Sequence, residues 1–208
     1  MAITAQDIQD AMKRVAAGFR TNGDYLTELD QAVGDGDLGI TTSKIADALD
    51  SYADQTAGDD LGKYLAAGGM AVNKVASSTM GTLLASGLMS AGKVVRGKEV
   101  LEPSDLATML QAAFEGLQAR GKASLGDKTI LDAMHPSVEA ISQAVQTTET
   151  LATAGQKLVD AAKAGRDAVT PLRNRVGRAS WVGERTEGSV DPGCEAWVII
   201  ASSLADIG

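Results

Sequence analysis

The chain has few of the residues that mark redox, disulfide or imidazole chemistry. Its 208 residues include one cysteine, Cys194, and one histidine, His135. A lone cysteine excludes an internal disulfide and is typical of a reducing, cytoplasmic compartment. No apolar run reaches the roughly 18 residues that a membrane helix needs, and the first residues lack the layout of a signal peptide. We therefore expect a cytoplasmic protein with no membrane partner.

Strand-forming and basic residues are also scarce. Aromatic residues make up 3% of the chain, and alanine, leucine, valine and methionine supply most of a 44% hydrophobic share. Alanine and leucine favour helices, whereas strands prefer aromatic and β-branched residues. The 19 Lys and Arg face 27 Asp and Glu, for a net charge of −8. We expect no nucleic-acid partner, because phosphate neutralisation needs basic side chains.

Helical periodicity runs through most of the chain and predicts one all-α domain over residues 1–208, with about eight or nine helices. Thr4 and Asp7 form an expected capping box at the first helix. Pro136 predicts a bend or break in the seventh helix. The run 197–200 is the best strand candidate, although a buried helix explains it equally well. The predicted helices cover about 5–20, a short segment ending near 33, segments around 45–52, 61–72 and 83–89, and then 103–121, 130–145, 151–168 and 194–204.

The stretch ELDQAVGDGDLGI, residues 28–40, places Asp30, Asp35 and Asp37 close together among three glycines. Three like charges this close favour a bound cation, and carboxylates select Mg²⁺ or Ca²⁺. An EF-hand counted from Asp35 fails, because Ile40 replaces its glycine and Ala46 its bidentate glutamate. Magnesium with phosphate as co-ligand is the better interpretation, since a helix begins at about residue 38. The alternative is a solvated acidic turn.

Two further glycine-rich segments bear on phosphate binding. The run GLMSAGK matches part of a P-loop, but Val94 follows it where Ser or Thr must bind the metal, so that interpretation is excluded. The helix start at 77–82, SSTMGT, offers hydroxyls and N–H groups, or serves as an ordinary helix cap. The loop 177–193, GRASWVGERTEGSVDPG, is long enough to indicate function. Its Trp181, Arg178, Arg185 and Asp191 resemble binding chemistry.

Four motifs in order then carry a family resemblance: LTELDQAVGDGDLG, RGKASLGDKTILDA, GRASWVGERTEG and DPG, at 26–39, 120–133, 177–188 and 191–193. Together they resemble the nucleotide-binding L subunit of dihydroxyacetone kinase, over nearly the whole chain. The resemblance implies a barrel of eight antiparallel amphipathic helices with the nucleotide at one end.

The same resemblance implies ADP or ATP and two Mg²⁺ ions as cofactors. It assigns Asp30, Asp35 and Asp37 to the metal and, with Arg178, to catalysis. It further suggests that Asp127 and Thr129 cap the next helix. The implied nucleotide contacts are Leu38, Gly39, Thr41, Thr42, Ser78, Thr79, Met80, Gly81, Gly121, Ile130, Arg178, Asp191, Pro192 and Gly193.

The resemblance also implies partners. In the family a separate K subunit carries the histidine that holds a short ketose, dihydroxyacetone or a relative such as erythrulose. In one branch of the family, ADP stays bound and a phosphoenolpyruvate-dependent phosphotransferase protein rephosphorylates it. In another branch, ATP exchanges freely as a substrate. Nothing assigns His135 such a role. The alternative is a nucleotide-binding regulatory or coactivator module without turnover.

The sequence departs from the family at three places. Leu38 stands where histidine is common, so we expect Thr41 or Thr42 to take over its contact. Residues 77–81, SSTMG, replace a loop that is often Gly-Gly-x-Ser-Gly. Cys194 follows DPG where alanine is usual, and we expect it to pack as a weak hydrophobe.

Overall fold

The structure is a computed structural model that describes residues 2–205. Over this range, nine α-helices and two short 3₁₀ helices form the regular structure, apart from one β-bridge between Ile3 and Leu101. The all-α prediction is confirmed. None of the described helices is long and apolar enough to cross a membrane. The elements are α1 (Ala5–Thr21), α2 (Gly23–Val33), α3 (Leu38–Ala53), α4 (Leu61–Val75), α5 (Thr79–Val94), α6 (Pro103–Gly121), α7 (Ile130–Gln146), α8 (Leu151–Val169), η1 (Arg178–Trp181), η2 (Gly183–Thr186) and α9 (Pro192–Ala205).

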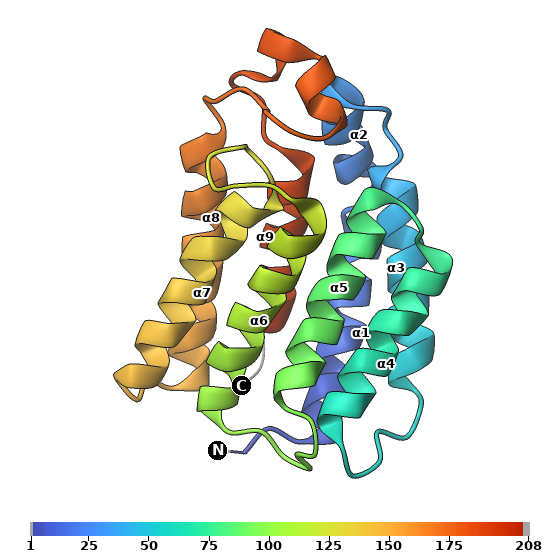
Figure 1. The fold of residues 1–208 in the computed structure, drawn as a ribbon, viewed down its shortest axis with the longest axis vertical. Helices are drawn as coiled ribbons and strands as arrows, with labels where there is room; N and C mark the ends of the chain where they lie inside the picture. Colours follow the sequence, from blue (N-terminus) through green and yellow to red (C-terminus); the bar gives the residue numbers. More distant parts are fainter. Residues whose placement is uncertain (1, 206–208) are drawn as a thin grey trace.

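Eight of these helices form a closed ring, and α2 lies outside it. Each helix contacts the next in the order α1, α3, α4, α5, α6, α7, α8, α9 and back to α1. Neighbouring helices run in opposite directions, as Figure 1 shows. The segment with η1 and η2, together with α2, covers one end of the barrel, while the start of α1 and the end of α9 lie toward the other (Figure 1). The predicted barrel of eight antiparallel helices is confirmed.

Local sequence signals set where the helices begin. The predicted capping box is present at α1, where the Thr4 N–H donates to Asp7 Oδ2 at 2.7 Å. At α5 the Ser78 hydroxyl accepts from the Gly81 N–H at 3.2 Å. Such caps satisfy N–H groups that the first turn of a helix cannot pair internally. They fix the ends of α1 and α5, and the α5 end belongs to the site described below.

Two expectations for the later helices are resolved by packing. Of the bend or break predicted at Pro136, the break is wrong, because α7 continues without interruption from Ile130 to Gln146. Gly165 on α8 makes room for this turn, since a Cβ there would lie 2.7 Å from Pro136 Cγ. The run 197–200 is helical and buried within α9. Its Trp197 donates from Nε1 to Ser137 Oγ of α7 at 3.1 Å, so the strand alternative is wrong.

Close helix packing also explains the glycines of the run GLMSAGK. A Cβ on Gly92 of α5 would lie 2.5 Å from the Gly62 carbonyl oxygen of α4, and the reverse holds for Gly62. The backbones of α4 and α5 approach so closely only because both side chains are absent. The run lies inside a helix, which agrees with the exclusion of a P-loop.

The interior of the ring is apolar. It contains a cavity of about 320 Å³ lined by side chains such as Met12, Leu65, Leu84, Leu110 and Leu117. Among the described residues, Asp7 is the one charged residue on its wall, and its carboxylate caps α1. A cavity with so few polar groups offers no recognition of charge, so polar chemistry must be sought at the ends of the barrel.

Candidate functional site

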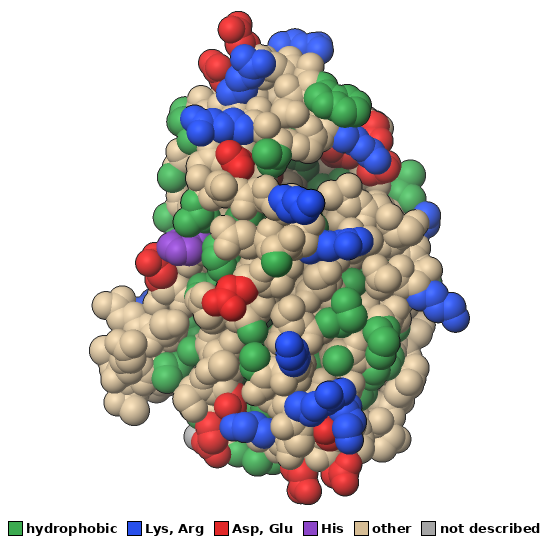
Figure 2. All heavy atoms as spheres, in the orientation of Figure 1, with side chains coloured by type: hydrophobic (Ala, Val, Ile, Leu, Met, Phe, Trp, Pro, Cys, Tyr) green, Lys and Arg blue, Asp and Glu red, His purple; other side chains and the backbone are tan. Residues whose placement is uncertain are grey.

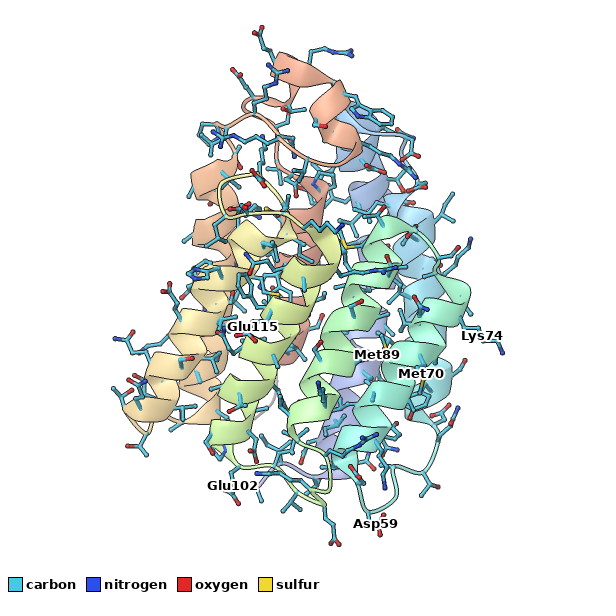
Figure 3. The ribbon with its side chains drawn as sticks, viewed as in Figure 1. Asp59, Met70, Lys74, Met89, Glu102 and Glu115 are labelled. Carbon is cyan, nitrogen blue, oxygen red and sulfur yellow. The ribbon has the colours of Figure 1, made fainter. Side chains whose placement is uncertain are left out.

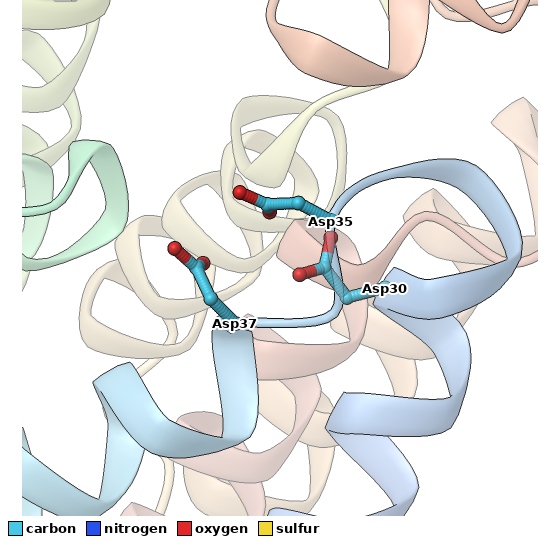
Figure 4. Close-up of side chains that lie close together, drawn as sticks. All are labelled: Asp30, Asp35 and Asp37. Atoms are coloured by element: carbon cyan, nitrogen blue, oxygen red, sulfur yellow. The ribbon is translucent and has the colours of Figure 1, made fainter.

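The three aspartates of the loop between α2 and α3 converge at the covered end of the barrel, as Figure 4 shows. One carboxylate oxygen from each of Asp30, Asp35 and Asp37 lies within 4.8 Å of the others. Gly36 allows this turn with φ at +74°, a conformation that favours glycine. Asp30 is further held by the Leu38 N–H, which donates to its Oδ2 at 3.1 Å. The loop therefore directs three negative charges into one small space.

Arg178 brings positive charge to this cluster from far along the chain. It forms an ion pair with Asp35, and its Nη1 lies 3.3 Å from Asp37 Oδ2. The Arg178 side chain is about half exposed, at 51%, and both carboxylates are at 48%. One guanidinium thus serves two of the three carboxylates. The cluster retains an excess of negative charge that a further cation can neutralise.

The start of α5 forms the next part of the site. Ser78 is the N-cap and Thr79 the first helical residue. N–H groups in the first turn of a helix lack internal partners and favour anions, especially phosphate. Gly81 keeps this turn tight, because a Cβ there would lie 2.1 Å from the Ala76 carbonyl oxygen. The turn therefore presents backbone N–H groups close to the carboxylates.

These elements enclose a cavity of about 240 Å³ at the covered end. Its wall includes the three aspartates, Arg178 and the hydroxyls of the α5 start, and it also includes the apolar residues Leu83, Leu117, Ala123 and Ile130. This combination suits a ligand that has both an anionic group and an apolar group. The predicted site residues on the wall are Asp30, Asp35, Asp37, Leu38, Thr41, Ser78, Thr79, Met80, Gly121, Ile130, Arg178, Asp191, Pro192 and Gly193.

Three of the predicted contact residues do not line this cavity. Gly39 packs against α2, where a Cβ would lie 2.3 Å from the Gly23 carbonyl oxygen. Thr42 is fully buried and its hydroxyl donates to the Gly39 carbonyl at 3.1 Å. Gly81 packs against Ala76. All three support the backbone around the site, and of the two threonines expected to replace the histidine contact only Thr41 lines the cavity.

A buried lysine that the sequence interpretation missed links the loop 177–193 to the segment 170–172. Lys128 is 1% exposed. Its Nζ donates to the backbone carbonyls of Thr170, Leu172 and Thr186 at 2.9, 2.8 and 2.6 Å. Burial lowers the pKa of this ammonium, and the nearby Asp191 carboxylate acts against that shift. The only sequence signal is the position of Lys128 between Asp127 and Thr129, the two residues expected to cap the next helix.

That helix start is built differently from the expectation. Thr129 is the N-cap of α7, as predicted, but its partner is Asp132, whose Oδ2 accepts from the Thr129 N–H at 2.8 Å. Asp127 instead accepts from the Ser124 N–H at 2.8 Å and closes the preceding turn. The assignment of Asp127 as a cap of α7 is therefore wrong. Thr129 lines the cavity, and Asp127 does not.

The start of α9 closes the site from the other side. Asp191 is buried, and burial raises the pKa of its carboxyl although the Cys194 N–H donates to it at 2.8 Å. Cys194 is fully buried, with its thiol donating to the Thr129 carbonyl at 2.9 Å. Burial also raises the pKa of this thiol, which makes it a poor nucleophile. Cys194 packs as predicted.

Three exposed or partly exposed residues, Trp181, Arg185 and His135, stay outside the site. Trp181 on η1 is 87% exposed, and neither it nor Arg185 lines the cavity. The expectation that the long loop carries binding residues therefore rests on Arg178 and Asp191. His135 lies on α7 with its ring 5.4 Å from that of Phe114 and its Nδ1 3.6 Å from Glu139. These contacts are structural ones.

The donor set of the site fits a hard divalent cation together with phosphate. Mg²⁺ binds carboxylate oxygens at roughly 2.1 Å, so ligands of one ion lie roughly 3–4 Å apart. The spacing of the three carboxylates, all within 4.8 Å, is compatible with that arrangement. The free N–H groups at the α5 start are compatible with phosphate.

Comparisons with known proteins agree with this geometry. Residues 32–206 match the DAK2 domain family. The chain is 29% identical over 209 residues to the "PEP-dependent dihydroxyacetone kinase, ADP-binding subunit DhaL" of Escherichia coli K12, covering 99% of this chain and 98% of that protein. It is 36% identical to "PEP-dependent dihydroxyacetone kinase 2, ADP-binding subunit DhaL" of Listeria innocua, covering 88% and 86%.

A solved structure shares the fold. The dihydroxyacetone kinase from C. freundii, in complex with AMP-PNP and Mg²⁺, superposes with a TM-score of 0.70 at 24% identity. The match covers 95% of this chain and 33% of that one. The family match over most of the chain and the 36% identity to a full-length relative lead to one conclusion. This chain belongs to the DAK2 domain family.

Proposed function

We propose that this protein is the phosphoryl-donor subunit of a dihydroxyacetone-type kinase, with a bound adenine nucleotide and Mg²⁺. The observation that carries the proposal is the convergence of Asp30, Asp35 and Asp37 with Arg178 and the α5 start on one cavity. The relatives named above are ADP-binding subunits of dihydroxyacetone kinases and have nearly the same length as this chain. The geometry of the cavity and the names of the relatives both support phosphoryl transfer.

The aspartates are the metal ligands in this proposal, and two Mg²⁺ ions are consistent with three carboxylates. When bound, Mg²⁺ neutralises the phosphate oxygens and so stabilises the charge of the transferred group. Arg178 donates to the same group from the loop 177–193. The backbone N–H groups of Thr79 and Met80 hold the phosphates, as the start of a helix does for anions.

The other part of the cavity holds the nucleoside. Leu83, Leu117 and Ile130 supply apolar surface for a purine, and Gly121 and Gly193 let the backbone approach it closely. At Gly193 a Cβ would lie 3.3 Å from the Ile130 N atom and from Met80 Cε. Any side chain at this position would narrow the cavity. This explains why the motif DPG ends in glycine.

In this proposal a partner supplies the acceptor sugar. The only histidine is engaged in structural contacts on α7, and no residue on the cavity wall can hold a ketone covalently except Lys128, whose ammonium is occupied by three carbonyls. We therefore propose a K-type subunit that holds a short ketose, such as dihydroxyacetone or erythrulose. The named relatives are PEP-dependent, which favours retained ADP that a phosphotransferase protein rephosphorylates.

Titration calorimetry with ADP, with and without Mg²⁺, tests the proposal directly. We expect binding that disappears when EDTA removes the metal, and ADP that remains with the protein after desalting. A coupled assay then combines the chain with a K-type subunit and a phosphoenolpyruvate-dependent phosphotransferase system, with either ketose as acceptor. Absence of nucleotide binding would refute the proposal. Binding without transfer to any acceptor would favour the regulatory alternative.

A further inference from the structure

The aspartate cluster is assembled from two helices, since Asp30 belongs to α2 and Asp37 precedes the first residue of α3 (Figure 4). Asp30 Oδ2 accepts from the Leu38 N–H at 3.1 Å, and a Cβ on Gly34 would lie 2.5 Å from Asp30 Oδ1. Among the described residues, the bond from Leu38 is the one hydrogen bond that joins a side chain of α2 to another helix. The place of Asp30 in the cluster therefore depends on how α2 packs against the start of α3.

Gly39, in the first turn of α3, lies where the two helices meet. A Cβ on Gly39 would lie 2.1 Å from Thr27 Oγ1 and 2.3 Å from the Gly23 carbonyl oxygen. The Thr27 hydroxyl is not free to turn away without loss, because it donates to that same carbonyl at 3.0 Å. The helices can approach this closely only because Gly39 has no side chain.

The atoms that face Gly39 share one side of α2 with the aspartate. Gly23, Thr27 and Asp30 follow one another at i, i+4 and i+7, which places them along one face of an α-helix. Thr27 is thus about one turn from Asp30. Gly39 adjoins Leu38, whose N–H holds the Asp30 carboxylate. A movement of α2 away from Gly39 would carry Asp30 away from Leu38 and from the other two aspartates.

Gly39 does not border the cavity that contains the cluster. It is buried, whereas Leu38 before it and Thr41 after it line the cavity wall. An influence of Gly39 on metal binding must therefore act through the position of α2 and not through a contact of its own with the ligand. The size of that influence follows from the overlap, because relieving a 2.3 Å contact requires the two helices to separate by about 1 Å.

We propose that Gly39 is a positioning residue, which sets the spacing between α2 and α3 so that Asp30 joins Asp35 and Asp37 in binding Mg²⁺. This inference rests on the proposed function, in which the three carboxylates bind the metal. One oxygen from each carboxylate lies within 4.8 Å of the others, and ligands of one Mg²⁺ ion lie roughly 3–4 Å apart. A separation of about 1 Å is enough to take Asp30 out of that range, and we expect it to weaken Mg²⁺ binding about tenfold.

ADP titrations by calorimetry at a series of Mg²⁺ concentrations test this proposal. They give the Mg²⁺ concentration at which ADP affinity reaches half its maximum, which we call the Mg²⁺ midpoint. In Gly39→Ala the Mg²⁺ midpoint should rise about tenfold relative to the unmodified protein. Saturating Mg²⁺ should then restore ADP affinity to within about threefold, because the contacts with the nucleotide itself are unaltered.

Gly92→Ala is the matched control for steric strain. A Cβ on Gly92 would lie 2.5 Å from the Gly62 carbonyl oxygen, again between two helices, but near the end of α5 opposite the site. We expect its melting temperature to fall while its Mg²⁺ midpoint stays within about twofold of that of the unmodified protein. If Gly39→Ala does not fold, judged by circular dichroism, Thr27→Val replaces it, since a methyl group then presses on Gly39, and the midpoint should rise at least threefold.

A double-mutant cycle with Asp30→Asn separates positioning from a general effect on the site. Asn at this position lacks the charge but still offers an oxygen to the Leu38 N–H. If Gly39 acts through Asp30, the second substitution has little left to remove. The Mg²⁺ midpoint of the double variant Asp30→Asn, Gly39→Ala should therefore lie within about threefold of that of Asp30→Asn alone.

Absence of Mg²⁺-dependent ADP binding in the unmodified protein would overturn the proposed function and this inference with it. An unchanged Mg²⁺ midpoint in Gly39→Ala, or an equal rise in Gly92→Ala, would overturn the inference alone. Two further results would do the same: full multiplication of the two effects in the double variant, and ADP affinity in Gly39→Ala that stays low at saturating Mg²⁺. In those cases Gly39 would act on the nucleotide and not on Asp30.

Discussion

The two ends of the barrel use aspartate in opposite ways. At the end away from the site, where Figure 3 labels Asp59 and Glu102, Asp105 accepts two bonds from Lys98 Nζ, at 2.7 and 2.8 Å. The Glu102 N–H donates to Asp105 at 2.9 Å. Figure 2 shows acidic and basic side chains together at this end. At the covered end, three aspartates share one arginine.

The difference shows how position decides the role of one residue type. Burial raises the pKa of the Asp105 carboxyl, but the Lys98 ammonium and the Glu102 N–H more than offset this, so the pKa lies below its ordinary value. Asp105 is thus satisfied by its own surroundings and stabilises a helix start. The aspartates of the site have carboxylate oxygens left for a ligand. We expect substitutions at the two ends to affect different properties.

The largest effect should follow Asp35→Asn. The substitution removes one charge and one proposed metal ligand from the cluster, and even residues that only support metal ligands contribute tenfold to a hundredfold in affinity. We expect the Mg²⁺-dependent affinity for ADP to fall about a hundredfold or more, with no detectable transfer. Calorimetry measures this, with the exposed Asp47→Asn as control. An unchanged ADP affinity in the presence of Mg²⁺ would show that the cluster does not bind metal.

The second-largest effect should follow Arg178→Met. Its guanidinium pairs with Asp35 and Asp37, and in the proposed function it donates to the transferred group. Removing one such donor costs roughly a hundredfold in rate, so we expect kcat to fall by about that factor while ADP affinity changes far less. Arg178→Lys should restore only part of the rate, because an ammonium lacks the planar fork of a guanidinium. Equal rates for both variants would contradict this role.

Lys128→Met separates the scaffold of the site from its chemistry. Three carbonyls would lose their donor, which we expect to cost about 2–3 kcal/mol in the free energy of unfolding. The loop 177–193 should also become sensitive to trypsin at Arg178 and Arg185. Urea denaturation and limited proteolysis measure these changes, with the exposed Lys74→Met as control. A loop that stays resistant would mean that Lys128 does not hold it.

These cases also show what the sequence could and could not predict. The helix positions and the clustering of Asp30, Asp35 and Asp37 follow from local spacing, so periodicity and the motif revealed them. Arg178 lies 143 positions from Asp35, and only the resemblance brought them together. The role of Lys128 was not predictable, because its partners are backbone carbonyls more than 40 positions away. Backbone atoms leave no trace in the pattern of side chains.

Asp105→Ala sharpens the comparison from the far end. It removes the ion pair with Lys98 and the reciprocal cap at Glu102, and we expect a loss of about 1–2 kcal/mol in the free energy of unfolding. ADP affinity should stay unchanged at temperatures where the variant is folded. A loss of affinity in the fully folded variant would mean that the two ends are coupled.

The pH dependence of this stabilisation has a defined sign. The folded pKa of Asp105 is below its ordinary value of 3.8. Its contribution is therefore fully present above that value and is lost as the pH falls through the folded pKa. Urea denaturation of the unmodified protein and of Asp105→Ala at pH 7 and then below pH 4 should show the difference between them shrinking. A difference that is constant with pH would mean that the carboxylate charge does not stabilise the fold.

Leu38→His should give the smallest effect and tests the site where the sequence departs from its family. Leu38 is 6% exposed and lines the cavity beside Thr41. An imidazole there can donate to phosphate or ribose, but it must also leave water and displace a packed leucine, and these contributions oppose each other. We expect ADP affinity to change less than about fivefold. A tenfold gain in affinity would show that the leucine limits nucleotide binding, and a tenfold loss would show that its packing shapes the cavity.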